Sequence, residues 1–368
     1  MLNNQNTDPS VDYLMKNTRI HILPTMNPDG LQRSSVGDCG SINGRANANN
    51  YDLNRNFPDL FQCNTDRIQP ETYSIVNWLE SNQFVISANF HGGSVVANYP
   101  WDNDVNSVVK DNPTGDNDVF VSIAKNYSYN NLIMRNAPCE YFQDGITNGA
   151  DWYPIRGGMQ DFNYWVYGCA EITVEVSCCK YPPPSDLNTI WLQNKKSLIE
   201  YLKLANTGVR GIVKFENGQV ASYLTVKIDQ REPFFKTGPL GEYYRILLPG
   251  MHKLSLALGC DEIYSTNIEI TANKLLLELN ITLSNDLYGK YVNYTLKSKY
   301  SLFCTASKQP ASCSNHDFTT KLSNYAQSTN GYNGNNGNNE FGLLSSSTKL
   351  HQLSIELVFI WIAIFLLL

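Results

Sequence analysis

The stretch QFVISANFHGG, residues 83–93, decides the fold class of this chain. Its first eight residues have the β-branched and aromatic character of a buried strand, and the two glycines end that strand sharply. A histidine at such a strand end is well placed to project its imidazole into a cleft. A single histidine is more often structural than a metal ligand, so the interpretation of His91 depends on the polar blocks on both sides of it.

The upstream polar block is GRANANNYDLNRNFP, residues 44–58. It contains two arginines and many asparagines with few apolar residues between them, so it cannot form a hydrophobic stripe. It is either a solvated loop or an anion clamp, because guanidinium groups bind a carboxylate through two hydrogen bonds and asparagine amides complete the bonding.

The downstream block, AEITVEVS at residues 170–177, alternates strictly. A period of two predicts a strand with one apolar face and one polar face. The apolar face carries Ile172, Val174 and Val176, and the polar face carries Glu171, Thr173, Glu175 and Ser177. The polar face is either solvated or carries a functional carboxylate, and the two cysteines that end the strand inside a large domain favour the second interpretation.

Six blocks in a fixed order carry a resemblance to a known family. They are HILPTMNPDG (21–30), YDLNRNFPD (51–59), FHGG (90–93), NYPWD (98–102), GGMQD (157–161) and EITVEVSCCKYP (171–182). From about residue 18 to about residue 282 the chain resembles the zinc metallocarboxypeptidases. Within them it is most similar to the regulatory branch of carboxypeptidases N, E, D and M, and to the M type in particular.

The resemblance implies roles for individual residues. His91 matches a ligand of the family's Zn²⁺, and Glu175 matches the general base that takes a proton from zinc-bound water. Arg45 matches the arginine that polarises the scissile carbonyl. Three further matches bind the last residue of the substrate: Asn54 and Arg55 hold its carboxylate, and Tyr153 closes over it.

Asp102 and Gln160 match the positions that line the pocket for the last side chain in this branch. An acidic residue in a desolvated pocket attracts a cation. The resemblance therefore implies a metallocarboxypeptidase that releases Lys or Arg from the C-termini of peptides and proteins.

The chain departs from the family pattern at the metal site. The family binds zinc through an upstream His-x-x-Glu motif together with a later histidine. None of the five histidines here (His21, His91, His252, His316 and His351) has a glutamate three residues further on. A catalytic zinc usually has three protein ligands, and two of these are missing from this chain. We therefore expect either a carboxypeptidase domain that is incomplete at its N-terminus or a catalytically inactive protein that binds peptides.

Other features indicate an extracellular protein, although residues 1–6 contain no apolar signal-peptide core. The nine cysteines suit an oxidising compartment, and Asn126, Asn280 and Asn293 lie in glycosylation sequons. The expected location is the extracellular face of the plasma membrane, or secretion. The net charge of −6 argues against nucleic-acid binding.

The pattern of elements predicts an α/β fold and then an all-β domain. Residues 1–206 form the mixed-sheet carboxypeptidase domain, with helices expected at 71–83 and 191–205. Residues 207–286 read as short strands with an Asn-Gly turn, and they resemble a transthyretin-like β-sandwich. Residues 287–352 are predicted to be a low-complexity stalk. The apolar end, 353–368, is predicted to attach the protein to a membrane, as a GPI-attachment signal or a retained tail anchor.

Overall fold

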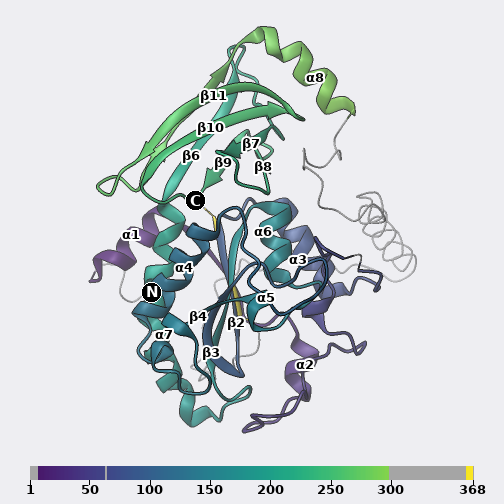
Figure 1. The fold of residues 1–368 in the computed structure, drawn as a ribbon, viewed down its shortest axis with the longest axis vertical. Helices are drawn as coiled ribbons and strands as arrows, with labels where there is room; N and C mark the ends of the chain where they lie inside the picture. Colours follow the sequence, from purple (N-terminus) through teal and green to yellow (C-terminus); the bar gives the residue numbers. More distant parts are fainter. Residues whose placement is uncertain (1–6, 63, 298–361, 368) are drawn as a thin grey trace, which may run out of the picture.

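The computed structural model describes residues 7–62, 64–297 and 362–367. The chain forms an α/β body and, above it in Figure 1, a smaller β-rich body. The α/β body is built around a six-stranded mixed sheet in the order β1-β14-β2-β5-β3-β4. Its strands are β1 (Arg19–Leu23), β2 (Ile86–His91), β3 (Ser94–Tyr99), β4 (Ile146–Asn148), β5 (Ala170–Ser177) and β14 (Ile362–Leu367). This confirms the predicted mixed α/β fold.

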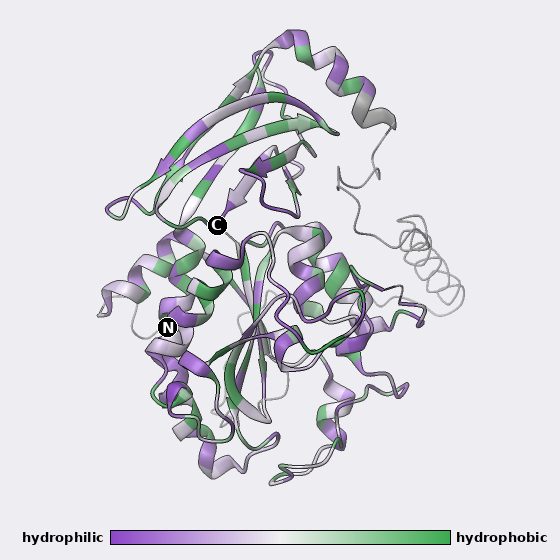
Figure 2. Ribbon diagram, in the orientation of Figure 1, coloured by the Kyte–Doolittle hydropathy of each residue, from purple (hydrophilic) through white to green (hydrophobic). Residues whose placement is uncertain are grey.

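The central strands are buried on both faces. All residues of β3 and all but the last of β2 and β5 are buried. Figure 2 shows green along these strands, whereas purple segments lie on the outer helices. The polar face predicted for residues 171–177 is therefore not solvated, because helices cover both sides of the sheet.

Helices cover the two faces of the sheet and form a separate core on each (Figure 1). Helices α4 and α7 pack on one face, and α3 and α6 on the other. The helices are α1 (Pro9–Asn17), α2 (Pro28–Arg33), α3 (Pro70–Ser81), α4 (Asn117–Asn130), α5 (Gly149–Trp152), α6 (Met159–Tyr167) and α7 (Pro184–Lys203). The helix expected at 71–83 is confirmed as α3. The one expected at 191–205 begins earlier, because Pro184 suits a first helical position, where no N–H is needed.

Strand β14 is formed by part of the apolar end of the chain. Ile362–Leu367, within the segment predicted to be a membrane signal or anchor, lie in the sheet, antiparallel to both β1 and β2, and membrane attachment through 353–368 stays a prediction. Their apolar, partly β-branched sequence suits a strand, and they satisfy the backbone groups on two strand edges that would otherwise be unpaired. Residues 353–361 and 368 lie outside the described part. No helix among the described residues is long and apolar enough to cross a membrane.

The β-rich body consists of two sheets that share one core. One sheet has the order β11-β10-β7-β8; in the other, β12 and β13 pair in succession along one side of β6, and β9 pairs along the opposite side. The strands are β6 (Gly208–Phe215), β7 (Thr225–Ile228), β8 (Phe235–Lys236), β9 (Glu242–Arg245), β10 (Gly250–Leu258), β11 (Asp261–Ile270), β12 (Leu276–Glu278) and β13 (Ile281–Leu283). Val213, Leu254 and Ile281 bring the two sheets together in the core. A likeness to the transthyretin-like domain stays a prediction.

Helix α8 (Tyr288–Lys297) occupies the start of the segment predicted to be a stalk. The rings of Tyr288 and Tyr291 lie 5.2 and 4.9 Å from the ring of Phe215 in β6. This aromatic contact gives the helix an apolar face to bury, which the low-complexity prediction overlooked. The rest of the predicted stalk, residues 298–352, lies outside the described residues.

A buried ion pair and a more exposed one join the two bodies. The guanidinium of Arg245 in β9 lies 2.6 Å from a carboxylate oxygen of Asp116, just before α4, and Tyr164 of α6 donates a hydrogen bond to the same oxygen. Arg231 binds Asp118 of α4 through two hydrogen bonds. These contacts fix the β-rich body beside the start of α4 and the end of α6.

Candidate active site

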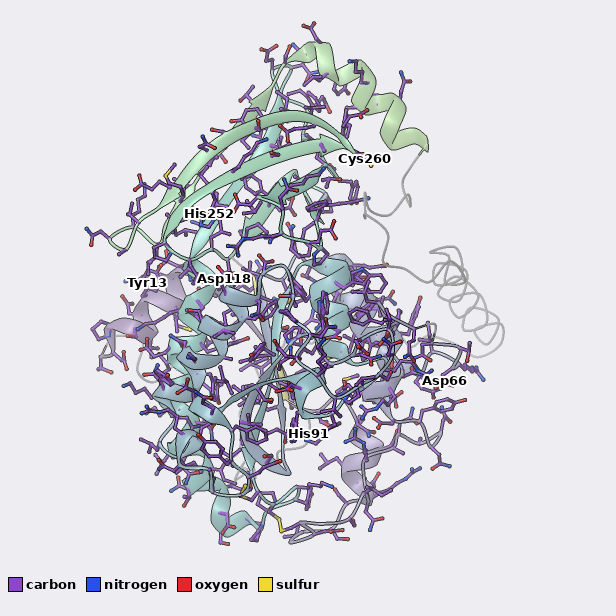
Figure 3. The ribbon with its side chains drawn as sticks, viewed as in Figure 1. Tyr13, Asp66, His91, Asp118, His252 and Cys260 are labelled. Atoms are coloured by element: carbon purple, nitrogen blue, oxygen red, sulfur yellow. A yellow bond between two sulfur atoms is a disulfide. The ribbon has the colours of Figure 1, made fainter. Side chains whose placement is uncertain are left out.

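His91 and Glu175 lie side by side because β2 and β5 are parallel neighbours. The register of the two strands pairs His91 directly with Glu175. The Nδ1 atom of His91 is 3.0 Å from Oε2 of Glu175. His91 therefore lies at the strand end in the α/β body, well away from His252 in the β-rich body (Figure 3). The histidine and the carboxylate singled out from the sequence belong to one site.

A disulfide brings the loop that carries Arg45 to the same strand end. Cys39 is bonded to Cys179, which lies shortly after Glu175 in the chain. Arg45 Nε donates to Oδ2 of Asp52 at 2.7 Å, and Oδ1 of Asp52 accepts the backbone N–H of Asn54. Asp52 thus positions two predicted site residues. Its only signal in the sequence is its place between them.

Arg55 is a guanidinium without a counter-ion. Its Nη1 donates to the backbone oxygen of Asn54 at 2.8 Å, and among the described residues no carboxylate forms a salt bridge with it. Burial lowers the pKa of Arg55, while Asp52, at a distance, opposes that effect. A half-buried cation of this kind favours an anionic ligand. The upstream polar block is therefore ordered in structure, not a solvated loop.

These residues converge on one cleft. Six of the eight predicted site residues line it, together with Asn98, Trp152, Ile155 and Thr173; the six are Arg45, Asn54, His91, Asp102, Tyr153 and Glu175. The other two contact residues that line the cleft. Arg55 donates a hydrogen bond to the backbone oxygen of Asn54, and the side-chain amide of Gln160 donates one to Asp102. The eight residues come from widely separated parts of the sequence and meet at one place.

Asp102 forms the acidic end of this cleft. It is 2% exposed, and its Oδ1 accepts hydrogen bonds from the side-chain amides of Asn98 (3.2 Å) and Gln160 (2.9 Å). Burial raises the pKa of Asp102 to about 7. The amide oxygens of Asn98 and Gln160 are buried and have no partner among the described residues. The end of the cleft therefore offers acceptors, and within the described part of the chain no cation forms a salt bridge with Asp102.

Asp161 is a second buried carboxyl beside Asp102, and we had assigned it no role from the sequence. It is 5% exposed, and both of its oxygens accept the backbone N–H of Asp102, at 2.9 and 3.0 Å. Burial, and then the charge of Asp102, raise the pKa of Asp161. An acidic residue next to Gln160 at the start of a helix was the only signal for it, and such residues usually just favour the helix dipole.

Tyr153 stands at the mouth of the cleft. It is 47% exposed, and its ring lies 4.8 Å from that of Trp152. Burial of part of the ring, and then the charge of Glu175, raise the pKa of Tyr153. A half-exposed aromatic ring at this place can cover a ligand, as the resemblance implies.

The described residues do not fit a complete catalytic zinc site. His91 and Glu175 are in contact, but no group of three His, Cys, Asp or Glu side chains that could hold a metal occurs among residues 7–62, 64–297 and 362–367. His21 packs edge-on against Phe84, 5.2 Å away, and burial lowers its pKa, so it is a core histidine. We therefore derive no chemical step through a metal from these residues.

Comparison with known proteins identifies the class. The sequence profile of the zinc carboxypeptidases matches residues 1–197, more than half of the chain, and the chain belongs to this family. It is 45% identical to carboxypeptidase M of Mus musculus over 272 residues, which cover 72% of this chain and 61% of that protein. It is 42% identical to carboxypeptidase D of Homo sapiens over 288 residues, covering 76% of this chain and 21% of that protein.

A third relative is the catalytic chain of carboxypeptidase N of Homo sapiens. The identity is 39% over 284 residues, covering 68% of this chain and 61% of the relative. The matches thus span about three fifths of the M and N relatives and about one fifth of the D relative. The predicted resemblance to the regulatory branch, near carboxypeptidase M, is confirmed.

Proposed function

We propose that this protein acts on peptides and proteins that end in Lys or Arg and releases that last residue. The observation that carries the proposal is the acidic end of the cleft, where Asp102 accepts hydrogen bonds from the amides of Asn98 and Gln160, whose buried amide oxygens have no partner among the described residues. A guanidinium or ammonium group supplies several N–H donors and a positive charge, so it can satisfy all three acceptors. An apolar side chain would leave them unsatisfied, at a cost of about 1–3 kcal/mol for each buried group.

The terminal carboxylate of the substrate is assigned to Arg55, with Asn54 beside it. Arg55 has no counter-ion among the described residues, and a carboxylate can accept two parallel hydrogen bonds from a guanidinium. The hydrogen bond from Nη1 to the backbone oxygen of Asn54 holds the guanidinium of Arg55 in place. Tyr153 covers the bound residue from the solvent side.

Glu175 is proposed as the general base and Arg45 as the group that polarises the scissile carbonyl. Both line the same cleft as Asp102, so a peptide anchored there by its last residue presents its final peptide bond to them. Glu175 would accept a proton from the attacking water, and Arg45 would stabilise the oxyanion that forms. The family name implies Zn²⁺, for which His91 is the one recognised ligand in this chain.

The remaining proposals concern location and accessory parts. Extracellular location at the plasma membrane, or secretion, is supported by two disulfides in the described part of the chain, Cys39–Cys179 and Cys139–Cys178. Membrane attachment through residues 353–368 and glycosylation at the sequons accompany this proposal. The β-rich body is proposed to be the transthyretin-like domain of this branch, with a role in stability or partner contact.

A second function is a peptide-binding protein without catalysis. The specific observation that favours it is the lack of a three-ligand metal group among the described residues. The carboxylate clamp and the acidic pocket would serve binding alone.

Release of arginine from a peptide ending in Ala-Arg distinguishes the two functions. The purified protein is incubated with the peptide, free arginine is quantified by chromatography, and Glu175→Gln is the matched control. Release that the substitution reduces at least about 100-fold supports the enzyme, because general bases contribute on that order. Binding of the peptide without release supports the binding protein, and neither binding nor release would refute both.

A further inference from the structure

The acidic end of the cleft contains two carboxyl groups where recognition of one cation requires only one. Asp102 and Asp161 are both almost fully buried and are joined through the backbone N–H of Asp102. Within the described part of the chain neither makes a salt bridge, although buried carboxylates are normally paired. The second carboxyl therefore needs a physical explanation.

Two adjacent buried carboxylates cannot both stay ionised without a cation. Desolvation penalises each charge, and their mutual repulsion penalises the second charge further, so one group retains a proton. The amide donors of Asn98 and Gln160 both go to Asp102, so this carboxyl can be stabilised in its ionised form. From the described residues, Asp161 receives one donor, the backbone N–H of Asp102.

The other charged groups near the pair do not neutralise it. Arg55 is the cation that acts on Asp102, but it forms no salt bridge with it. Asp59 and Glu171 in β5 add negative charge, because Asp59 raises the pKa of both aspartates and Asp102 raises that of Glu171. Tyr153 lines the same cleft as Asp102, whereas Asp151 and Arg156 are exposed.

We propose that Asp102 and Asp161 share one proton while the pocket is empty and release it to solvent when a cationic side chain binds. This inference rests on the proposed function and deepens it. In this step the carboxyl O–H bond breaks and the proton goes to water or buffer. The ammonium or guanidinium group of the ligand then neutralises the negative charge that the proton leaves behind. Asp161 is then a specificity-determining residue, since it sets the pH range in which the pocket accepts lysine or arginine.

Titration calorimetry with L-arginine tests the proposal on the full chain. Measurements in two buffers with different ionisation enthalpies give the number of protons released on binding. Burial raises the pKa of Asp102, one member of the pair, to about 7, so binding should release more proton at pH 6 than at pH 8, and the Kd at pH 6 should be about tenfold weaker than at pH 8.

Asp161→Asn keeps an oxygen that can accept the N–H of Asp102 but removes the second carboxyl. It should bind L-arginine with a Kd that changes less than about threefold between pH 6 and pH 8, and should release less than half as much proton at pH 6. Asp186→Asn, at an exposed position of α7, is the matched control and should behave as the unsubstituted protein.

The outcomes separate the inference from the proposed function. Binding of L-arginine to the unsubstituted protein with no proton release and a constant Kd would overturn the inference and leave the proposed function standing, whether or not Asp161→Asn folds. Unchanged proton release in a folded Asp161→Asn would assign the proton to Asp102 alone and would also overturn it. No binding of L-arginine at any pH would overturn the proposed specificity, and the inference with it.

Discussion

Replacing Gly149 by alanine should displace the carboxylate of Asp102 and weaken the binding of arginine. Gly149 is the first residue of α5, and a Cβ atom built there would lie 1.8 Å from Oδ1 of Asp102 and 2.9 Å from its Cα. Atoms cannot approach so closely, so either Asp102 or the start of α5 must move. The backbone of Gly149 is not in the left-handed region, and strain in φ therefore does not complicate the test.

The expected size of the effect follows from the contact. Overpacking of this kind costs about 1–3 kcal/mol, and the better helix propensity of alanine returns up to about 1 kcal/mol, so the free energy of unfolding should fall by about 1–2 kcal/mol. Misplacing a buried charge partner costs about 2 kcal/mol or more in binding, which corresponds to a Kd for L-arginine about thirtyfold weaker.

The assays are urea denaturation and titration calorimetry with L-arginine at pH 8. Gly40→Ala is the matched control, because a Cβ at Gly40 would meet nothing within 4 Å and its φ is not in the left-handed region. The control should change stability by less than about 0.5 kcal/mol and leave the Kd unchanged. If Gly149→Ala bound L-arginine as tightly as Gly40→Ala, the reasoning that the added Cβ displaces a carboxylate needed for arginine binding would be refuted.

Three further substitutions test other parts of the structure. Arg245→Met should lower the free energy of unfolding by about 3 kcal/mol or more in urea denaturation, because it leaves Asp116 buried without its closest cation. Lys16→Met, which breaks an exposed ion pair, is the control and should cost less than about 0.5 kcal/mol. Equal losses in the two variants would contradict the importance of the buried pair. Burial raises the pKa of Glu171 to about 7, so the unfolded chain binds fewer protons between pH 4.5 and pH 7, and the Glu171 contribution to stability should fall by about 3 kcal/mol over that range. The pH dependence of the melting temperature should be flatter in Glu171→Gln, and an unchanged slope would show that the group is not buried as described. Glu175→Gln should abolish release of arginine while the Kd for L-arginine changes less than about threefold, and a large loss of binding would contradict its role as base.

Periodicity and composition predicted the elements whose residues decide their own structure. Strand β5 occupies residues 170–177 as expected, because strict alternation of β-branched residues leaves few other possibilities. Helix α3 follows from apolar residues at helical spacing. Burial of both faces of β5 could not be predicted, since the helices that cover it lie far away in the sequence.

The site residues come from distant blocks of the sequence, and only the family resemblance allowed us to predict that they share one cleft. The residues that support them carried no such signal. Asp52 acts through hydrogen bonds to Arg45 and Asn54, and Asp161 acts through one backbone N–H, and neither arrangement leaves a pattern in the sequence.

Two segments near the C-terminus have structures that their composition did not predict. The segment from residue 288 was too polar to predict packing, yet two tyrosines give α8 an apolar face. The apolar C-terminus predicted membrane attachment and gave no sign of a strand, yet Ile362–Leu367 pair with two strand edges of the sheet. A short apolar run is compatible with either environment, and only the available partners decide between them.

The affinity of the cleft for the last residue of a peptide tests the central claim most directly. Three peptides identical except for their ends are compared by calorimetry at pH 8: one ends in Arg, one in arginine amide and one in Leu. We expect the Arg peptide to bind at least about thirtyfold more tightly than each of the others, because loss of the carboxylate leaves Arg55 unpaired and loss of the cation leaves Asp102 unpaired, at about 2 kcal/mol each. Equal affinity for all three peptides would contradict the claim that this cleft recognises a basic C-terminal residue.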